Sequence, residues 1–322
     1  MSYKNKLVFL LSLIGVLSLI YIAVIIFSPE RRGARSSSYA WLDKKLADRI
    51  GRIIITSEGR KIELIKNNSQ WFVLHNGVEY PARQMRIEDF IGIFTSYSAW
   101  NLRSSNASTH SRFGLDADAA SRVMIYGENT LLLDLLLGYV DNAGQIYVRK
   151  YGEDEVRSGE NVITYYLANY VTAWYNLRLF EESGNGYIDV DNVQRLSVYN
   201  STETQIFSRV NRSWEISVST PPPLSGFYNV NAEQGIVESY IRNLLNSEGD
   251  DFAGIRYSAA IDTSYSRIVV EFGNGKISTI RFSEPDEEGR RFACIDGSEY
   301  IYSIPAWVST RLFRDAAGFE RQ

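Results

Sequence analysis

The stretch Asn68-Ser69-Gln70-Trp71-Phe72-Val73 decides how this sequence is read, because a similar stretch follows later as Asn211-Arg212-Ser213-Trp214-Glu215-Ile216. A pattern that recurs within one chain indicates a repeated structural unit. In each copy two polar residues and a third small or polar residue lead into a tryptophan. The chain has 322 residues, and at about 150 residues per domain this length also predicts two domains.

An amphipathic stretch follows each tryptophan, roughly over residues 83–97 and 231–246. In both stretches apolar residues recur at positions i, i+3, i+4 and i+7, which places one apolar stripe on one face of a helix. These residues are Ile87, Phe90, Ile91 and Phe94 in the first copy and Val237, Tyr240, Ile241 and Leu244 in the second. We therefore take as markers of the two repeat cores Trp71, Phe90, Phe94, Trp214, Tyr240 and Leu244.

Strand-like runs surround each predicted helix. Residues 61–64 alternate between charged and apolar side chains, which predicts a half-buried strand. Runs that favour strands also follow the helices at 122–127 and 267–273, each leading into a hairpin turn. The pattern predicts an α+β fold with two tandem repeats, each an antiparallel sheet with one packed helix. We expect a first repeat over 49–184, a second, divergent repeat over 185–315, and a C-terminal tail over 316–322.

The N-terminal region contains an uncharged run of 21 residues over 7–27. At 1.5 Å per residue a helix of this length spans roughly 30 Å, the thickness of the hydrocarbon core of a bilayer. A cleaved signal peptide would have a shorter apolar region and a small-x-small cleavage site, and a buried core helix is usually shorter. The run therefore predicts a transmembrane anchor over 7–27, preceded by a short cytoplasmic tail over 1–6 and followed by a linker or stalk over 28–48.

The orientation of this anchor depends on flanking charges that nearly balance. Lys4 and Lys6 precede the run, while Arg31, Arg32 and Arg35 follow it. The short tail and the single apolar segment favour a cytoplasmic N-terminus. We expect a single-pass inner-membrane protein with its main domains in the periplasm or otherwise outside the cytoplasm; the reversed topology, with cytoplasmic domains, is the alternative.

The composition excludes several classes of protein. The formal net charge is −4, from 34 basic and 38 acidic residues, which argues against a nucleic-acid partner. One cysteine excludes an intramolecular disulfide framework and any multi-cysteine metal or cluster site. Two histidines leave little for histidine-based chemistry. We predict no metal and no cofactor.

Candidate catalytic residues each have a simpler structural explanation. His75 precedes a turn, His110 lies in a polar loop, and Cys294 stands in an apolar strand-like run. The acidic groups at 116–118 and 189–192 lack the glycine and the bidentate glutamate of a calcium-binding loop. No phosphate-binding Walker A sequence is present. We predict no catalytic residues and expect that the protein is not an enzyme.

Aromatic residues gather near the end of the first repeat. A core or a seam between domains would use such rings for bulk, whereas a ligand surface would leave them exposed. Both interpretations stay open from the sequence. The candidate interaction surface consists of Tyr165, Tyr166, Tyr170, Trp174 and Tyr175.

Several short motifs, taken in their order, resemble a bacterial family catalogued as a domain of unknown function, DUF4340. The resemblance covers most of residues 50–180 and, more faintly, 187–313. The second copy departs from the pattern, because Ser283-Glu284 stands where the first has Leu137-Gly138. The matching motifs are Trp71-Phe72-Val73, Asn76-Gly77, Tyr80-Pro81-Ala82, Glu88-Asp89-Phe90-Ile91, Phe113-Gly114-Leu115-Asp116, Leu135-Leu136-Leu137-Gly138 and Tyr147-Val148-Arg149.

The resemblance implies a function that the residues alone do not. Members of this family look like auxiliary parts of ABC-type transporters, of the kind linked to gliding motility. It implies a non-catalytic, membrane-anchored accessory protein whose partner is a transporter permease, its ATPase or a related envelope protein. The alternative is a module that binds envelope polymers, or a hydrolase, which for glycoside chemistry would need two carboxylates facing one cleft.

Overall fold

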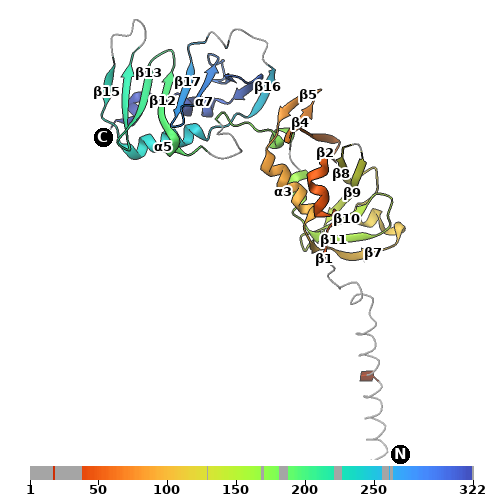
Figure 1. Ribbon diagram of the computed structural model, residues 1–322. Helices are drawn as coiled ribbons and strands as arrows, with labels where there is room; N and C mark the ends of the chain where they lie inside the picture. Colours follow the sequence, from red (N-terminus) through yellow and green to blue (C-terminus); the bar gives the residue numbers. More distant parts are fainter. Residues whose placement is uncertain are drawn as a thin grey trace, which may run out of the picture. The chain divides into compact units, whose positions relative to one another are not determined.

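The computed structural model describes residues 17–18, 38–128, 130–167, 170–180, 188–220, 227–255, 261 and 264–320. These residues form two compact units, whose helices and strands are drawn in Figure 1. The first unit comprises the described residues up to Gly77 and from Arg86 to Tyr170. The second comprises Val78–Met85 and the described residues from Val171 onward.

The first large sheet has nine strands, and hairpins join most neighbours in the sequence. The strands are β2 (Ile50–Ser57), β3 (Arg60–Asn67), β4 (Gln70–His75), β5 (Val78–Pro81), β7 (Asn101–Ser104), β8 (Ser121–Gly127), β9 (Thr130–Val140), β10 (Gln145–Lys150) and β11 (Val156–Glu160). They lie in the order β5-β4-β3-β2-β8-β9-β10-β11-β7. A separate two-stranded sheet pairs β1 (Ser38–Tyr39) with β6 (Ser98–Ala99).

The second large sheet also has nine strands. They are β12 (Val193–Tyr199), β13 (Thr204–Val210), β14 (Ser213–Ser219), β15 (Tyr228–Val230), β16 (Asp251–Ile255), β17 (Arg267–Phe272), β18 (Ile277–Phe282), β19 (Arg291–Ile295) and β20 (Tyr300–Ile304). Their order is β15-β14-β13-β12-β17-β18-β19-β20-β16. Counted along the chain, this is the order of the first sheet, so the two sheets share one topology.

The repeated sequence stretch forms the same hairpin turn in both units. Asn68 and Ser69 have φ values of 49° and 68°, and Asn211 and Arg212 have the same two values. Positive φ at both central residues is required by a type I′ turn, whose twist matches that of the flanking strands. The buried tryptophan of each repeat follows two residues after the turn, on β4 or on β14.

One helix of 12 residues follows the first four large-sheet strands of each unit. These helices are α3 (Gln84–Thr95) and α5 (Gln234–Leu245), and each buries the apolar stripe expected from its spacing. All six core markers are buried, with at most 4% of any of them exposed. The other described helices are α4 (Thr164–Leu167), α7 (Ala306–Leu312), η1 (Lys44–Arg49), η2 (Ala107–Thr109), η3 (Ser111–Phe113), η4 (Val171–Trp174), η5 (Val190–Asn192) and η6 (Ala316–Phe319).

Two segments expected to be linker or tail contribute to the cores where the structure describes them. Trp41 and Leu42 are buried, and the Leu42 backbone N–H donates to the carbonyl of Phe94 at 2.9 Å. Near the C-terminus, the ring of Phe319 is fully buried and lies 4.9 Å from that of Tyr240. Apolar side chains within a mostly polar stretch of sequence are still buried when the fold brings them against a hydrophobic core.

The predicted fold class, an N-terminal transmembrane helix followed by two α+β repeats, is contradicted. The described chain consists mainly of antiparallel strands in two nine-stranded sheets, with few helices. Its longest helices, α3 and α5, have 12 residues and reach about 18 Å, far less than a bilayer requires. Local periodicity does not report how many strands join one sheet, because pairs such as β2 with β8 and β12 with β17 join segments far apart in the chain.

The expected localisation, a single-pass inner-membrane protein with periplasmic domains, is overturned by a related finding. Among the described residues no helix combines the length and the apolar character needed to cross a membrane. The predicted anchor over 7–27 lies outside the described residues, apart from Leu17 and Ser18. The tail predicted over 1–6 also lies outside them.

Candidate functional site

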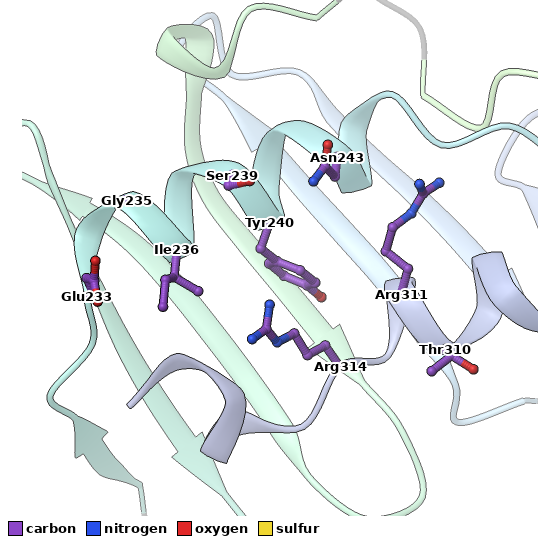
Figure 2. A pocket seen from close by; sticks show the side chains of 9 residues that line it. All are labelled: Glu233, Gly235, Ile236, Ser239, Tyr240, Asn243, Thr310, Arg311 and Arg314. Carbon is purple, nitrogen blue, oxygen red and sulfur yellow. The ribbon is translucent and has the colours of Figure 1, made fainter. Parts of the chain in front are cut away.

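A pocket of about 610 Å³ lies in the second unit, between α5 and α7. Its walls come from one face of α5, the last turn of α7 and the segment after α7, as Figure 2 shows. This volume is in the range of small-molecule sites. The residues that line the pocket are Glu233, Gly235, Ile236, Ser239, Tyr240, Asn243, Thr310, Arg311 and Arg314.

The start of α5 is fixed against the sheet by Gln234. Its side-chain carbonyl accepts the backbone N–H of Trp214 at 2.8 Å, and its amide donates to the Trp214 carbonyl, also at 2.8 Å. One side chain therefore satisfies both backbone groups of the repeat tryptophan. Because Trp214 itself is buried, this pair of bonds holds the first turn of α5, and with it one end of the pocket, at a fixed place on β14.

Tyr240 forms the floor of the pocket and joins its two walls. Its hydroxyl donates to the carbonyl oxygen of Leu312, at the end of α7, with a distance of 2.7 Å. Its ring packs against those of Phe207 and Phe319, 5.5 Å and 4.9 Å away, and these two rings lie 5.4 Å from each other. Burial raises the pKa of Tyr240 well above its usual value, so the hydroxyl stays protonated and continues to donate.

Arg311 is held in place on the α7 side. Its guanidinium lies over the ring of Trp307, 5.2 Å from the centroid, and donates to the hydroxyl of Ser247 at 3.3 Å. Trp307 itself is 67% exposed and does not line the pocket, so this aromatic–cation pair joins a pocket residue to the surface of the unit. In the described part of the chain, the Nε atom of Arg311 is buried and has no hydrogen-bond partner.

Arg314 reaches below Tyr240 from the segment after α7 (Figure 2). It donates to the carbonyl of Gly318 at 2.5 Å and lies over the ring of Phe319, 5.0 Å from the centroid. A Cβ atom on residue 318 would come within 2.5 Å of the Arg314 Nε. Glycine at this position therefore leaves room for the guanidinium against the backbone of η6.

Positive charge dominates the pocket on the α7 side. Within the residues that the structure describes, neither Arg311 nor Arg314 forms an ion pair, whereas other arginines do, as with Arg290 and Asp250 at 2.7 Å. The one lining carboxylate is Glu233, at the opposite end of the row that Figure 2 shows along α5. The arrangement can hold an anionic group near the arginines and a polar group near Ser239.

A comparison with protein families identifies the chain. The sequence pattern of the family described as "Domain of unknown function (DUF4340)" matches residues 71–253, which are 183 of the 322 residues. The chain belongs to the DUF4340 family. No curated protein matches it.

The residues matched by the DUF4340 family include one wall of the pocket and not the other. The match begins at Trp71, in the first unit, and ends within β16, in the second. It therefore includes the α5 wall from Glu233 to Asn243 and ends before α7. The two arginines and Trp307 lie beyond the matched residues, so the charged wall is a feature of this chain's C-terminal segment.

A smaller, more polar pocket of about 360 Å³ lies beside the other face of α5. Asp191, one of its lining residues, pairs with Arg209 at 2.5 Å, and this ion pair lowers the pKa of the carboxyl below its usual value. Asp189 accepts the backbone N–H of Asp191 at 3.0 Å and caps η5. The acidic residues of 189–192 thus have structural partners. Among the described residues no cluster of histidine, cysteine and acidic side chains could hold a metal ion.

The five aromatic residues proposed as an interaction surface are divided between the two units. In the first unit Tyr165 and Tyr170 are 64% and 70% exposed, while Tyr166 is buried against Phe90, with ring centroids 4.9 Å apart. In the second unit Trp174 and Tyr175 are buried. Of the set, Tyr165 and Tyr170 are therefore the exposed members.

Cations cover both exposed tyrosines of this set. The guanidinium of Arg86 lies 4.6 Å from the ring centroid of Tyr165, and that of Arg60 lies 4.9 Å from Tyr170. In the second unit the ring of Tyr175 packs edge-on against Phe252 at 5.1 Å. Burial raises the pKa of Tyr175, which fits a packing role for this ring.

The remaining chemical candidates do not line the pocket. The His110 ring nitrogen is 3.2 Å from the carbonyl oxygen of Asp154, and the His75 ring contacts Asn76 at 3.2 Å. Cys294 is buried on β19, with 1% of its surface exposed. A buried thiol in an apolar strand packs as a small hydrophobic residue.

Sequence reasoning missed the functional side chains on α7. Trp307 and Arg311 stand at positions i and i+4, the spacing of one helix face, and Arg314 follows after the end of α7. That spacing was present in the sequence as a signal.

Proposed function

We propose that this DUF4340 protein is a non-catalytic accessory protein that binds a component of an ABC-type transporter complex, of the kind linked to gliding motility. The family resemblance supplies the partner class. The observation that carries a binding role is the exposed Trp307 beside Arg311 and the pocket. Tryptophan and arginine dominate the binding energy of many protein interfaces, and an exposed tryptophan held by a neighbouring cation is already ordered for contact.

The chemistry of the pocket supports binding over catalysis. Its lining contains one carboxylate, Glu233, whereas glycoside hydrolysis uses two that flank the bond. The Tyr240 hydroxyl donates a hydrogen bond to the Leu312 carbonyl, and the raised pKa of this tyrosine keeps it protonated, so it does not act as a base near neutral pH. The arginines supply fixed positive charge, which positions an anionic group without transferring a proton.

A module that binds envelope polymers is the second candidate. The exposed ring of Trp307 could stack on a sugar, and the side chains of Ser239, Asn243 and Thr310 offer hydroxyl and amide groups along the pocket. Such a ligand would occupy the same site. The hydrolase form of this candidate has less support, because one carboxylate lines the pocket.

Affinity purification of the tagged chain from its native cells, with bound proteins identified by mass spectrometry, tests the accessory role. We expect near-stoichiometric recovery of a transporter permease and its ATPase. Replacing Trp307 by Ala should lower this recovery at least about tenfold, because interface tryptophans commonly contribute 2 kcal/mol or more. Tyr228→Ala is the matched control, since Tyr228 is a 52% exposed aromatic residue of the same unit, on β15.

The outcomes separate clearly. Recovery of the tagged protein alone would refute the accessory role. Equal recovery of these proteins with the wild type and with the Trp307→Ala variant would support the accessory role. It would also show that the partner does not bind through Trp307 on α7. Retention of purified wall polysaccharide, with no transporter component bound, would favour the second candidate.

A further inference from the structure

We propose that β15, an edge strand of the second sheet, pairs with the β15 of a second copy of this chain, antiparallel and about a two-fold axis at Asn229. The proposal goes beyond the accessory role and does not rest on it. β15 is the terminal strand of its sheet, as Figure 1 shows, and a terminal strand leaves one row of backbone N–H and C=O groups without a partner strand in the described chain. An identical strand related by a two-fold axis can satisfy that row on both copies.

The first argument compares the edge strands that the structure describes in the two large sheets. Proteins protect such edges from unwanted pairing with charges, prolines or irregular register. In the first sheet β5 carries Glu79 and Pro81, and β7 carries Arg103. In the second sheet β16 carries Asp251, and its register with β20 shifts. β15 has none of these features, because it reads Tyr228-Asn229-Val230 and pairs with β14 in regular register.

The second argument is an apolar face that ends uncovered at β15. Tyr228 lies directly opposite Val218 of β14, and directly opposed residues share one face of a sheet. Val230 lies opposite Ile216 in the same way. Both partners on β14 are buried, whereas Tyr228 is 52% exposed and Val230 is partly exposed. A strand added at this edge therefore covers apolar surface that continues the core of the second unit.

The third argument is that β15 complements itself. About a two-fold axis at Asn229, Tyr228 of each copy lies opposite Val230 of the other. Aromatic and β-branched side chains stabilise an antiparallel sheet when they lie opposite each other. Asn229 then lies opposite its own copy, and an amide offers both donors and acceptors, so two such groups can bond to each other. Its side-chain oxygen already accepts the Ser217 hydroxyl at 2.9 Å, which orients the amide.

The length of the contact is limited. Residues 227–231, Phe-Tyr-Asn-Val-Asn, are uncharged, so no like charges meet within them. Immediately afterwards Ala232 forms an antiparallel bridge with Glu320, so the chain itself occupies the next position. A contact of a few residues per copy buries far less than the roughly 1,200 Å² of a standard interface, which predicts a weak dimer that forms at high concentration.

Sedimentation velocity of the purified full-length chain, from micromolar to millimolar concentration, tests the proposal. We expect the average sedimentation coefficient to rise with concentration, from that of a monomer towards that of a dimer. Hydrogen exchange measured over the same range locates the contact. Backbone amides of β15 should exchange more slowly as the dimer forms, whereas those of β16, at the opposite edge of the sheet, should be unchanged.

Charge variants at the two-fold axis test the register. Asn229→Lys and Asn229→Asp each place like charges opposite each other, so each should raise the dissociation constant of the dimer at least about tenfold. An equimolar mixture of the two variants should associate at least as tightly as the wild type, because opposite charges then face each other, and misfolded variants would not give this recovery. Gln194→Lys, at an exposed position of the interior strand β12, is the matched control and should leave the dissociation constant unchanged.

The self-association and the accessory role can be separated by two variants. Trp307 lies on α7, so Trp307→Ala should keep the dimer while it lowers the recovery of transporter proteins. Tyr228→Ala should keep that recovery while it raises the dissociation constant of the dimer at least about threefold, because it removes the exposed aromatic ring of β15.

A monomer at every concentration would overturn the proposal. So would equal self-association of the wild type and both Asn229 variants, or a mixture of the two variants that associates no better than either alone. Slower exchange in β15 that appears only when a transporter component is added would also overturn it, because the edge would then bind an extended segment of that partner.

Discussion

Replacing Tyr240 by Phe removes one hydroxyl from the floor of the pocket and leaves the ring in place. The lost interaction is the 2.7 Å hydrogen bond to the Leu312 carbonyl, while the contacts with Phe207 and Phe319 remain. Leaving a buried acceptor without its donor costs about 1–3 kcal/mol. We expect the free energy of unfolding of the second unit to fall by about that amount.

The measurement must resolve one unit from the other, because a chain of two units does not have to unfold in a single transition. Hydrogen exchange followed by mass spectrometry provides this resolution. Peptides from α5 and α7 should exchange faster in the variant, whereas those from α3, in the first unit, should be unchanged. Tyr228→Phe, at an exposed tyrosine of the same unit, is the matched control and should stay within about 0.5 kcal/mol of the wild type.

The reasoning would be refuted if Tyr240→Phe and Tyr228→Phe gave the same exchange in α7. That result would mean that water or another donor satisfies the Leu312 carbonyl as well as the hydroxyl does. A loss much larger than about 3 kcal/mol would equally count against it, because the variant would then have disturbed the aromatic packing as well.

Three further predictions follow from burial and backbone geometry. Burial raises the pKa of Tyr240 above 10.0 in the folded chain, so the unfolded chain releases this proton at a lower pH than the folded chain does. Above pH 10 the free energy of unfolding should therefore fall by about 1.4 kcal/mol per pH unit because of this group. Urea unfolding measured across that pH range should show a weaker dependence of this free energy on pH for Tyr240→Phe than for the wild type. Gly92 lies within α3, where an added Cβ would meet no other atom, so Gly92→Ala should raise the free energy of unfolding by about 0.5–1 kcal/mol. Gly138→Ala should lower this free energy by at least about 1–3 kcal/mol, because its Cβ would lie 2.0 Å from the Phe113 carbonyl oxygen. Thermal unfolding of both variants measures the two effects. Trp214→Ala should cost about 3–5 kcal/mol in denaturant unfolding, and a loss below about 1 kcal/mol would contradict its place in the core.

Local sequence patterns predicted the repeated elements well where they depend on neighbouring residues. The i, i+3, i+4, i+7 spacing located the buried faces of α3 and α5, since that spacing is a property of the helix itself. The polar residues Asn68-Ser69 and Asn211-Arg212 form hairpin turns that were not predicted from the sequence, although two residues suffice to define such a turn. The extent of the sheets was missed, because closing each nine-stranded sheet depends on pairs between strands far apart in the chain, β2 with β8 and β7 with β11 in the first sheet and β12 with β17 and β16 with β20 in the second.

The pocket shows what only tertiary structure decided. The sequence by itself determined the apolar face of α5, the position of Tyr240 on it, and the helical spacing of Trp307 and Arg311. It did not determine that α7 would lie beside α5, because that placement depends on a hydrogen bond between Tyr240 and the Leu312 carbonyl and on the packing of Phe319 under the same ring. Tyr240 and Leu312 are 72 positions apart in the sequence, and they meet because α5 and the end of α7 are both packed onto the core of the second unit. Burial of apolar side chains in that core depends on many segments together, so no local sequence pattern reports it.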